Sequence, residues 1–164
     1  MTLEERLMFH EGIRVKPYKD TEGIWTIGCG RNMEGNGFSI EESQMIFGRP
    51  RVTLEQALRF FTTNILTPRQ VKTLLKNDIE KTRASLYQQL PVLFPSLSPL
   101  RQEVLIDMGF MGIQRLLEFN KMLAALAEGD YEKAAVEMMN SKWSVQVGGR
   151  AKRLAHIMEF NEEA

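Results

Sequence analysis

The sequence lacks several features that define whole classes of protein. It has a single cysteine, Cys29, among 164 residues, which excludes an intramolecular disulfide and favours synthesis in a reducing compartment. No stretch approaches the ~20 apolar residues of a membrane-spanning helix, so we expect no membrane insertion. The charged N-terminus has no apolar core of the kind that signal peptides carry, so we expect no signal peptide.

An excess of charge of one sign is also missing. Lys and Arg total 21 and Asp and Glu total 21, so the formal net charge is zero. Proteins that bind nucleic acid usually concentrate positive charge, and we therefore expect no nucleic-acid partner. The two histidines, His10 and His156, stand without other metal-ligand residues at a recognisable spacing, so we expect no metal site.

What is present is one strand-rich stretch followed by repeated helix signals. A short helix should end at His10–Glu11, and residues 13–30 combine β-branched and aromatic residues with a turn, which predicts a small sheet. Helix-start patterns then begin at Ser39, at Thr53 and at Thr67. Further helices are expected at about 67–90, 98–111, 115–128, 130–142 and 149–160. One early sheet followed by helices predicts an α+β protein.

Glu11, Asp20 and Thr26 form the first group that could carry chemistry. Cutting a glycosidic bond needs a carboxylic acid at the leaving oxygen and a second carboxylate as nucleophile or base. A glutamate at a helix end near buried surface could keep a raised pKa, whereas an aspartate in a wet turn stays ionised. The simpler interpretation is that Glu11 is a solvated helix-end residue and Asp20 an ordinary turn former.

The residues around this group resemble the opening motif of the T-even type phage lysozymes, glycoside hydrolase family 24. The motif reads His10-Glu11-Gly12-Ile13-Arg14, then Tyr18-Lys19-Asp20-Thr21-Glu22-Gly23, then Trp25-Thr26-Ile27-Gly28-Cys29-Gly30. Eight and then five residues separate the glutamate, aspartate and threonine, as in that family. Residues 66–85 are similar to the family's long helix, and 134–143 with 150–153 are similar to its C-terminal signature.

The resemblance implies a mostly helical, two-lobed lysozyme fold. Residues 13–65 would form a small sheet-bearing lobe and residues 66–90 a connecting helix. Residues 1–12 and 91–164 would form a helical lobe, with the substrate cleft between the two lobes. The catalytic residues would be Glu11 as general acid and Asp20 with Thr26 as the pair that positions or activates water.

The family pattern also implies residues that support catalysis or bind substrate. Arg150 would reach back to the catalytic glutamate, the alternative being a basic patch on an amphipathic helix. Asn32, Phe110 and Glu137 fall at substrate-contact positions, although Phe110 is equally compatible with a place in the core. The chain departs from the family at Glu137, and also at two methionines on the substrate side, Met111 and Met122.

Two further features of the N-terminal half are expected to be structural. Arg31 stands where the family has histidine, and Asp78 matches that histidine's acidic partner, so we predict that the two side chains meet. The segment from about 33 to 65 is longer than in the T-even relatives, and the sequence does not reveal the purpose of the extra length.

Taken with the resemblance, these residues predict an endolysin that hydrolyses the β-1,4 bond between N-acetylmuramic acid and N-acetylglucosamine in bacterial peptidoglycan. We expect a monomer without cofactor, held in the host cytoplasm until a holin releases it to the wall. One alternative is a lytic transglycosylase, which has no need of a water-holding pair. The others are a non-catalytic wall-binding relative and a helical interaction module.

Overall fold

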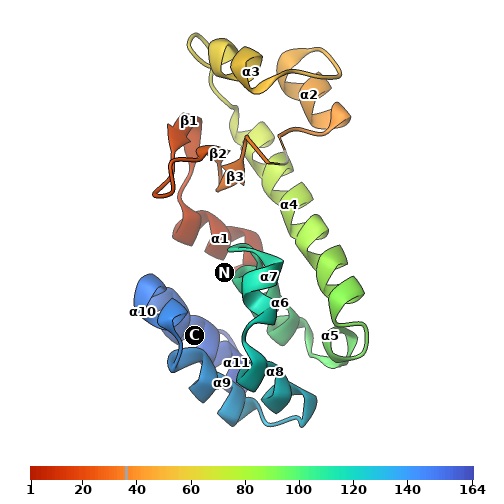
Figure 1. Cartoon of the computed structure of the whole chain (residues 1–164), viewed down its shortest axis with the longest axis vertical. Helices are drawn as coiled ribbons and strands as arrows, with labels where there is room; N and C mark the ends of the chain where they lie inside the picture. The colour runs from red at the N-terminus through yellow and green to blue at the C-terminus, as the bar shows by residue number, and fades with distance from the viewer. Residues whose placement is uncertain (36) are drawn as a thin grey trace. The chain divides into compact units, whose positions relative to one another are not determined.

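The computed structural model describes residues 1–35 and 37–164 and divides them into two compact units (Figure 1). The N-terminal unit is Thr2–Asp78, and the C-terminal unit is Ile79–Ala164 together with Met1. Helices dominate both units, and a small antiparallel sheet lies in the first, which confirms the α+β prediction. The lobe boundaries drawn from the sequence group residues 1–12 with the C-terminal helices, and that assignment stays a prediction.

The N-terminal unit begins with α1 (Leu3–Glu11), whose bounds follow from local sequence. Thr2 and Glu5 form a reciprocal capping box that satisfies the backbone N–H groups at the start of the helix. Gly12 ends it with φ 76°, a backbone conformation that side chains other than glycine rarely adopt. The predicted end at Glu11 is confirmed, and Glu11 is left on the last turn.

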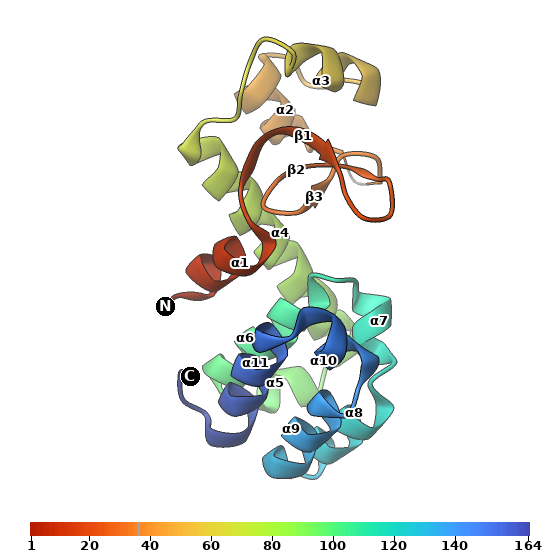
Figure 2. The ribbon, with the colours of Figure 1, turned by 90° about the vertical axis from the view of Figure 1, so that its left-hand side faces the viewer.

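Three strands follow α1: β1 (Arg14–Lys19), β2 (Trp25–Gly28) and β3 (Arg31–Asn32). They pair antiparallel in the order β1-β2-β3, and Figure 2 shows the hairpin that joins the first two. The hairpin turn closes because Asp20 N donates to Ile24 O and Gly23 N donates to Asp20 O, both at 3.0 Å. The predicted small sheet is therefore confirmed.

The segment from 33 to 65 supplies much of the core of this unit. Its helices α2 (Ile40–Phe47) and α3 (Leu54–Phe60) both begin with the capping boxes predicted from sequence. Phe47 packs edge-on against three other phenylalanines, which are Phe38, Phe60 and Phe61. They pack with buried Ile27 of β2 and with buried Leu74, a residue of the long helix that follows, in one hydrophobic cluster. The extra length therefore builds core, a purpose that its sequence had not revealed.

The long helix α4 (Pro68–Gln89) agrees with the predicted 67–90 to within a residue at each end. Thr67 Oγ1 accepts a hydrogen bond from Gln70 N at 3.1 Å, and Gln70 Oε1 accepts one from Thr67 N at 2.9 Å. Proline at the first helical position has no N–H to leave unpaired. The boundary between the two compact units falls within this helix, between Asp78 and Ile79.

The C-terminal unit is a set of helices around one apolar segment. The helices are α5 (Leu93–Ser96), α6 (Pro99–Gly109), α7 (Ile113–Leu117), α8 (Asn120–Ala127), α9 (Tyr131–Met139), α10 (Lys142–Val147) and α11 (Gly149–Phe160). Within α6, every residue from Val104 to Gly109 is buried, so this helix forms the centre of the unit. No helix among the described residues is both long enough and apolar enough to cross a membrane.

Two of the expected C-terminal helices were drawn too long. The stretch 115–128 is interrupted after Leu117, where Phe119 takes φ −76° and ψ 61°, outside the helical region. The stretch 130–142 ends at Met139, and Ser141 starts a new helix, α10, by accepting a hydrogen bond from Ser144 N at 3.2 Å. Continuous periodicity concealed both breaks, because a short bend need not disturb the spacing of apolar residues.

Candidate active site

Glu11 is held at the end of α1, close to the loop between β2 and β3. Its side chain is half-buried, and Gly30 approaches it so closely that a Cβ there would lie 3.3 Å from Glu11 Oε2. Gly30 has φ 77°, which glycine adopts without the steric cost that other residues meet. The glycine of this loop thus leaves room for the carboxyl group.

Asp20 stands where β1 ends, and one of its two carboxylate oxygens is used by the turn. Oδ1 accepts hydrogen bonds from Glu22 N at 2.8 Å and from Ile24 N at 2.9 Å. These bonds fix the carboxylate against the hairpin. Oδ2 has no hydrogen-bond partner among the residues that the structure describes, so it can accept from water or substrate.

Thr26 occupies the middle strand, buried, and pairs with one residue on each side. It lies opposite Tyr18 of β1 and opposite Asn32 of β3, so the three side chains share one face of the sheet. The Thr26 hydroxyl donates to Ile24 O at 2.9 Å, which leaves its oxygen able only to accept. Asp20, Thr26 and Asn32, all singled out from sequence, are thereby brought to one sheet.

Asn32 has a structural task of its own. Its Oδ1 accepts from Glu34 N at 2.7 Å and from Gly35 N at 2.9 Å, bonds that form the turn after β3. A sugar contact from this residue would therefore use its amide nitrogen. The role of Asn32 in substrate binding stays a prediction.

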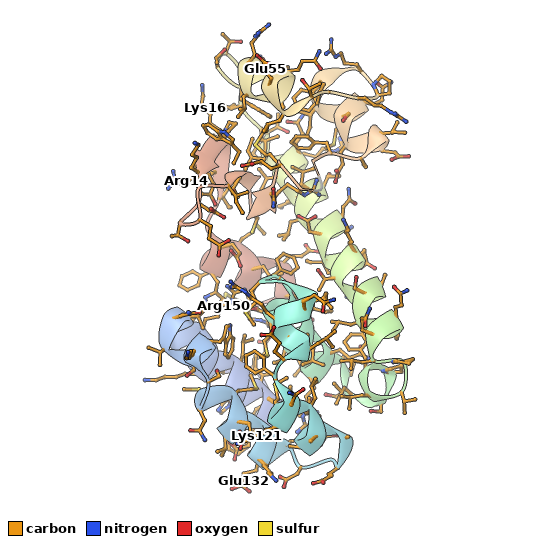
Figure 3. The ribbon with its side chains drawn as sticks, in the orientation of Figure 1. Arg14, Lys16, Glu55, Lys121, Glu132 and Arg150 are labelled. Atoms are coloured by element: carbon orange, nitrogen blue, oxygen red, sulfur yellow. The ribbon has the colours of Figure 1, made fainter. Side chains whose placement is uncertain are left out.

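Tyr18 is a member of this group that the sequence had not singled out. Burial raises the pKa of its phenol, the Arg14 cation lowers it, and the Glu11 and Asp20 carboxylates raise it again, with a net rise. The Arg14 guanidinium lies 4.7 Å from the centre of the Tyr18 ring, a cation–π distance. Arg14 is labelled on the hairpin in Figure 3.

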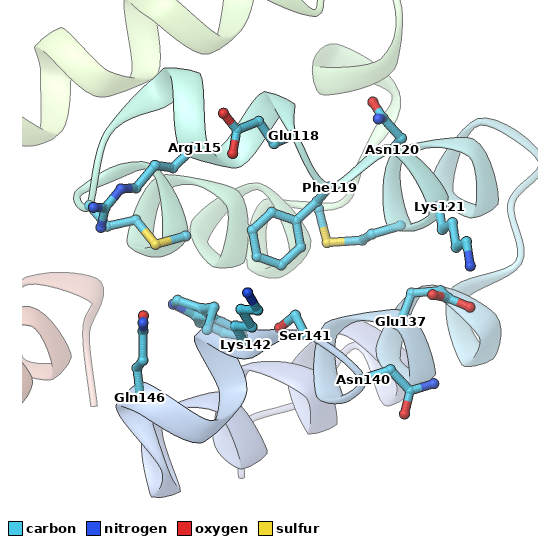
Figure 4. Close-up of a pocket in the computed structure, with 13 residues that line it drawn as sticks. Arg115, Glu118, Phe119, Asn120, Lys121, Glu137, Asn140, Ser141, Lys142 and Gln146 are labelled. Atoms are coloured by element: carbon cyan, nitrogen blue, oxygen red, sulfur yellow. The ribbon is translucent and has the colours of Figure 1, made fainter.

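The other predicted substrate-contact residues lie in the C-terminal unit, where a pocket of about 750 Å³ opens (Figure 4). One wall comes from residues 111–122 and the facing wall from residues 137–146. Glu137 lines the pocket, as do Met111 and Met122, the two methionines at which the chain departs from the family pattern. Phe110 is half-buried at the end of α6 and is not among the lining residues.

Arg150, on α11, binds Asp107 of α6. Its Nε donates to Asp107 Oδ1 at 2.8 Å, and one of its terminal nitrogens lies 2.7 Å from the same oxygen. The Asp107 side chain is fully buried, and a buried carboxylate needs such a partner. Sequence reasoning missed Asp107, although a lone acid within the apolar run Val104–Met108 was a usable signal. The expectation that Arg150 orients Glu11 stays a prediction.

Comparison with known proteins identifies the family of this chain. The family model described as phage lysozyme matches residues 8–158, which is nearly the whole chain. The chain belongs to the phage lysozyme family. It is accordingly a glycoside hydrolase of the lysozyme type, with peptidoglycan as its substrate. The described residues contain no group of three or more His, Cys, Asp or Glu that could hold a metal ion.

Individual relatives resemble this lysozyme over almost its full length. Probable T4-type lysozyme 1 of Dictyostelium discoideum is 27% identical over 96% of this chain and 94% of that protein. Probable T4-type lysozyme 2 of the same organism is 26% identical over the same shares. The pre-baseplate central spike protein Gp5 of Enterobacteria phage T4 is 31% identical over 96% of this chain, but the match covers only 28% of that longer protein.

The predicted contact between Arg31 and Asp78 of this lysozyme is confirmed, and it has a third member. Arg31 Nε donates to Asp78 Oδ1 at 3.0 Å, while both terminal nitrogens donate to Glu42, each at 2.8 Å. Further bonds run from Arg31 to Gly37 O and Leu74 O. Glu42 is also part of the helix-start pattern at Ser39, because its Oε1 accepts from Ser39 N and its own N donates to Ser39 Oγ.

Proposed function

We propose that this lysozyme is a muramidase that cuts the β-1,4 bond between N-acetylmuramic acid and N-acetylglucosamine and thereby lyses a bacterial host. Glu11 protonates the leaving oxygen as general acid. Asp20 and Thr26 hold a water molecule on the opposite face of the sugar, where it attacks the anomeric carbon. The reaction uses no cofactor, because proton transfer and water suffice for it.

The observation that carries the proposal is the pattern of hydrogen bonds already made by Asp20 and Thr26. Asp20 Oδ1 is occupied by two backbone N–H groups, and the Thr26 hydroxyl proton is occupied by Ile24 O. Both side chains therefore present acceptors only. A water that donates one proton to each keeps a lone pair for attack, which suits direct displacement.

The surroundings of Glu11 suit a general acid. The carboxyl group is half-buried at the end of a capped helix, and Gly30 lies against it without a side chain. A protonated carboxyl needs this kind of fixed position, because proton transfer requires hydrogen-bond reach to the leaving oxygen.

The decisive experiment replaces each carboxylate by its amide. Glu11→Gln keeps the shape and removes the titrating proton, so wall clearing should fall by several orders of magnitude, since acid catalysis alone contributes ~10²–10⁴-fold. Asp20→Asn should be nearly as severe. Glu55→Gln, which changes an exposed carboxylate on α3, is the matched control and should keep full activity. A folded Glu11 or Asp20 variant with more than a tenth of wild-type activity would contradict the assignment.

The stereochemistry of the product separates hydrolysis from the alternatives. Attack by water opposite the leaving group inverts the anomeric centre, so the first-formed product should be the inverted anomer. NMR of fresh digests of a defined peptidoglycan fragment measures this directly. Predominant 1,6-anhydro ends would mean transglycosylation, and a retained anomer would mean a covalent intermediate.

The pocket of the C-terminal unit supplies the proposed substrate-binding residue Glu137. Its charge stands where relatives of the T-even type have an amide, and Lys121 lies on the facing wall (Figure 4). Both walls carry charged groups, and apolar Met122 and Trp143 also line the pocket. The wall chemistry preferred by this lysozyme should therefore differ from that of relatives with an amide. Release from the host cytoplasm through a holin belongs to the same proposal.

A further inference from the structure

The sheet face that carries Asp20 and Thr26 contains a polar group that the proposed mechanism does not use. Tyr18 lies directly opposite Thr26 in the pairing of β1 with β2. Asp20 follows two residues later, and the ladder continues to it through the bond from Asp20 N to Ile24 O. Side chains two residues apart on a strand share a face, as do directly opposite ones. Tyr18 therefore stands beside both water-holding side chains.

The electrostatic surroundings of Tyr18 place its hydroxyl in range of both carboxylates. The charges of Glu11 and Asp20 each raise the pKa of the phenol, in addition to the larger rise caused by burial and against the fall caused by Arg14. The phenol consequently stays protonated across the working pH range. It is a neutral hydrogen-bond donor that feels the charge of both Glu11 and Asp20.

Contacts within the protein account for the ring of Tyr18 but not for its hydroxyl. Arg14 lies over one face of the ring at 4.7 Å. Within residues 1–35 and 37–164, no hydrogen bond from the Tyr18 hydroxyl to another residue is present. A half-buried phenol usually finds a hydrogen-bond partner, so a ligand is the natural candidate here.

The chemistry of the neighbouring groups indicates what that ligand atom is. Asp20 Oδ2 and Thr26 Oγ1 can only accept hydrogen bonds. The carbonyl and ring oxygens of N-acetylated sugars likewise only accept them. Those sugar oxygens need donors, and the amide nitrogen of Asn32, whose Oδ1 is already occupied, is one of them. The Tyr18 hydroxyl adds a donor directly beside Thr26.

We propose that the Tyr18 hydroxyl donates a hydrogen bond to an oxygen of the sugar bound between Glu11 and Asp20, which makes Tyr18 a substrate-binding residue. The inference rests on the proposed function, because it concerns the same site. The bond forms when the sugar binds and persists in the transition state, so it contributes to affinity rather than to the chemical step.

The test is Tyr18→Phe, which removes one oxygen and keeps the ring and its contact with Arg14. Loss of one neutral hydrogen bond should raise KM for a soluble tetrasaccharide of alternating N-acetylglucosamine and N-acetylmuramic acid about 3- to 10-fold, with kcat unchanged. In a Glu11→Gln background, the Kd of the same tetrasaccharide should rise by the same factor. Tyr87→Phe, an exposed phenol on α4, is the matched control and should change neither value.

Each outcome separates this inference from the function on which it rests. Unchanged KM and Kd in Tyr18→Phe would overturn the inference, as would a lower Tm with no change in KM. A wild-type protein that binds the tetrasaccharide but does not cut it would overturn the proposed function instead. The Kd comparison would still decide the role of Tyr18 in that case.

Discussion

Two arginines of this lysozyme, Arg31 and Arg150, each bind a buried carboxylate, but their surroundings differ. Arg31, in the N-terminal unit, contacts Glu42 and Asp78 and also donates to two backbone carbonyls. Arg150, in the C-terminal unit, binds the carboxylate and the backbone carbonyl of Asp107. The first guanidinium joins β3, the loop before α2, α2 itself and α4. The second joins α11 to α6.

The comparison separates two roles of an arginine, which are stabilising the fold and orienting a catalytic residue. The N–H donors of Arg31 are directed to groups of its own unit, so its charge is used to stabilise the fold. Burial lowers the pKa of the Arg31 guanidinium, but its bonds to Glu42 and Asp78 outweigh burial and raise it overall. Arg150 is the arginine that the family resemblance connects with Glu11. Changes at Arg31 should therefore affect stability alone, and changes at Arg150 should affect activity as well.

The largest effect is expected for Arg31→Ala. The substitution leaves the buried Glu42 carboxylate without its cation, and breaking such a pair costs about 3–5 kcal/mol in the free energy of unfolding. Urea unfolding followed by the fluorescence of Trp25, in a Trp143→Phe background, reports on the N-terminal unit. Arg59→Ala, which removes an exposed ion pair on α3, should change the same quantity by less than about 0.5 kcal/mol. Equal losses of unfolding free energy in the two variants would mean that the ion pairs of Arg31 stabilise the fold no more than an exposed pair does.

The second-largest effect is expected at low pH, where protonation of Glu42 should remove its contribution to the free energy of unfolding. Burial raises the pKa of Glu42, but hydrogen bonds from Arg31, Asn77 and the Ser39 backbone lower it to about 2 from the usual 4.5. Because the folded pKa is depressed, the stabilisation is present above pH 4.5 and is lost as pH falls through about 2. The difference in unfolding free energy between wild type and Glu42→Gln should shrink by about 3 kcal/mol between pH 6 and pH 2. A difference that is constant across this range would contradict the assigned role of the carboxylate.

The contact between Arg31 and Asp78 should give a smaller coupling, since Asp78 is partly exposed. A double-mutant cycle with Arg31→Ala and Asp78→Ala, measured by denaturant unfolding at neutral pH, should give about 1–3 kcal/mol. The same cycle on the exposed pair of Arg59 and Glu55 should give at most about 0.5 kcal/mol. Additive effects at Arg31 and Asp78 would show that Glu42 alone is the energetic partner.

The smallest change in free energy is expected for Arg150→Lys, and its readout is activity. Lysine keeps the charge but loses the planar fork, so wall clearing should fall about 10-fold if Arg150 orients Glu11, with little loss of stability. Arg31→Lys is the matched control and should lower stability without a specific loss of kcat. Equal losses of activity in the two lysine variants would remove the distinction between the two arginines.

Local sequence determined the features that depend on neighbours along the chain. Capping boxes at Thr2, Ser39 and Thr53 placed three helix starts, because the bonds involved span only three residues. The Asp20–Gly23 turn placed the hairpin for the same reason. The spacing of Glu11, Asp20 and Thr26 was readable as a motif, since all three lie within one short stretch of chain.

Apart from the contact of Arg31 with Asp78, which the family resemblance predicted, tertiary structure alone decided which distant groups became partners. Glu42 could have been a helix cap only, and Asp107 an exposed helix acid, until burial removed water and made a cation necessary. The row of Tyr18, Thr26 and Asn32 depends on strand register, which shifts between Arg14 and Tyr18. Desolvation and register are properties of the packed chain, and no local pattern of residues encodes them.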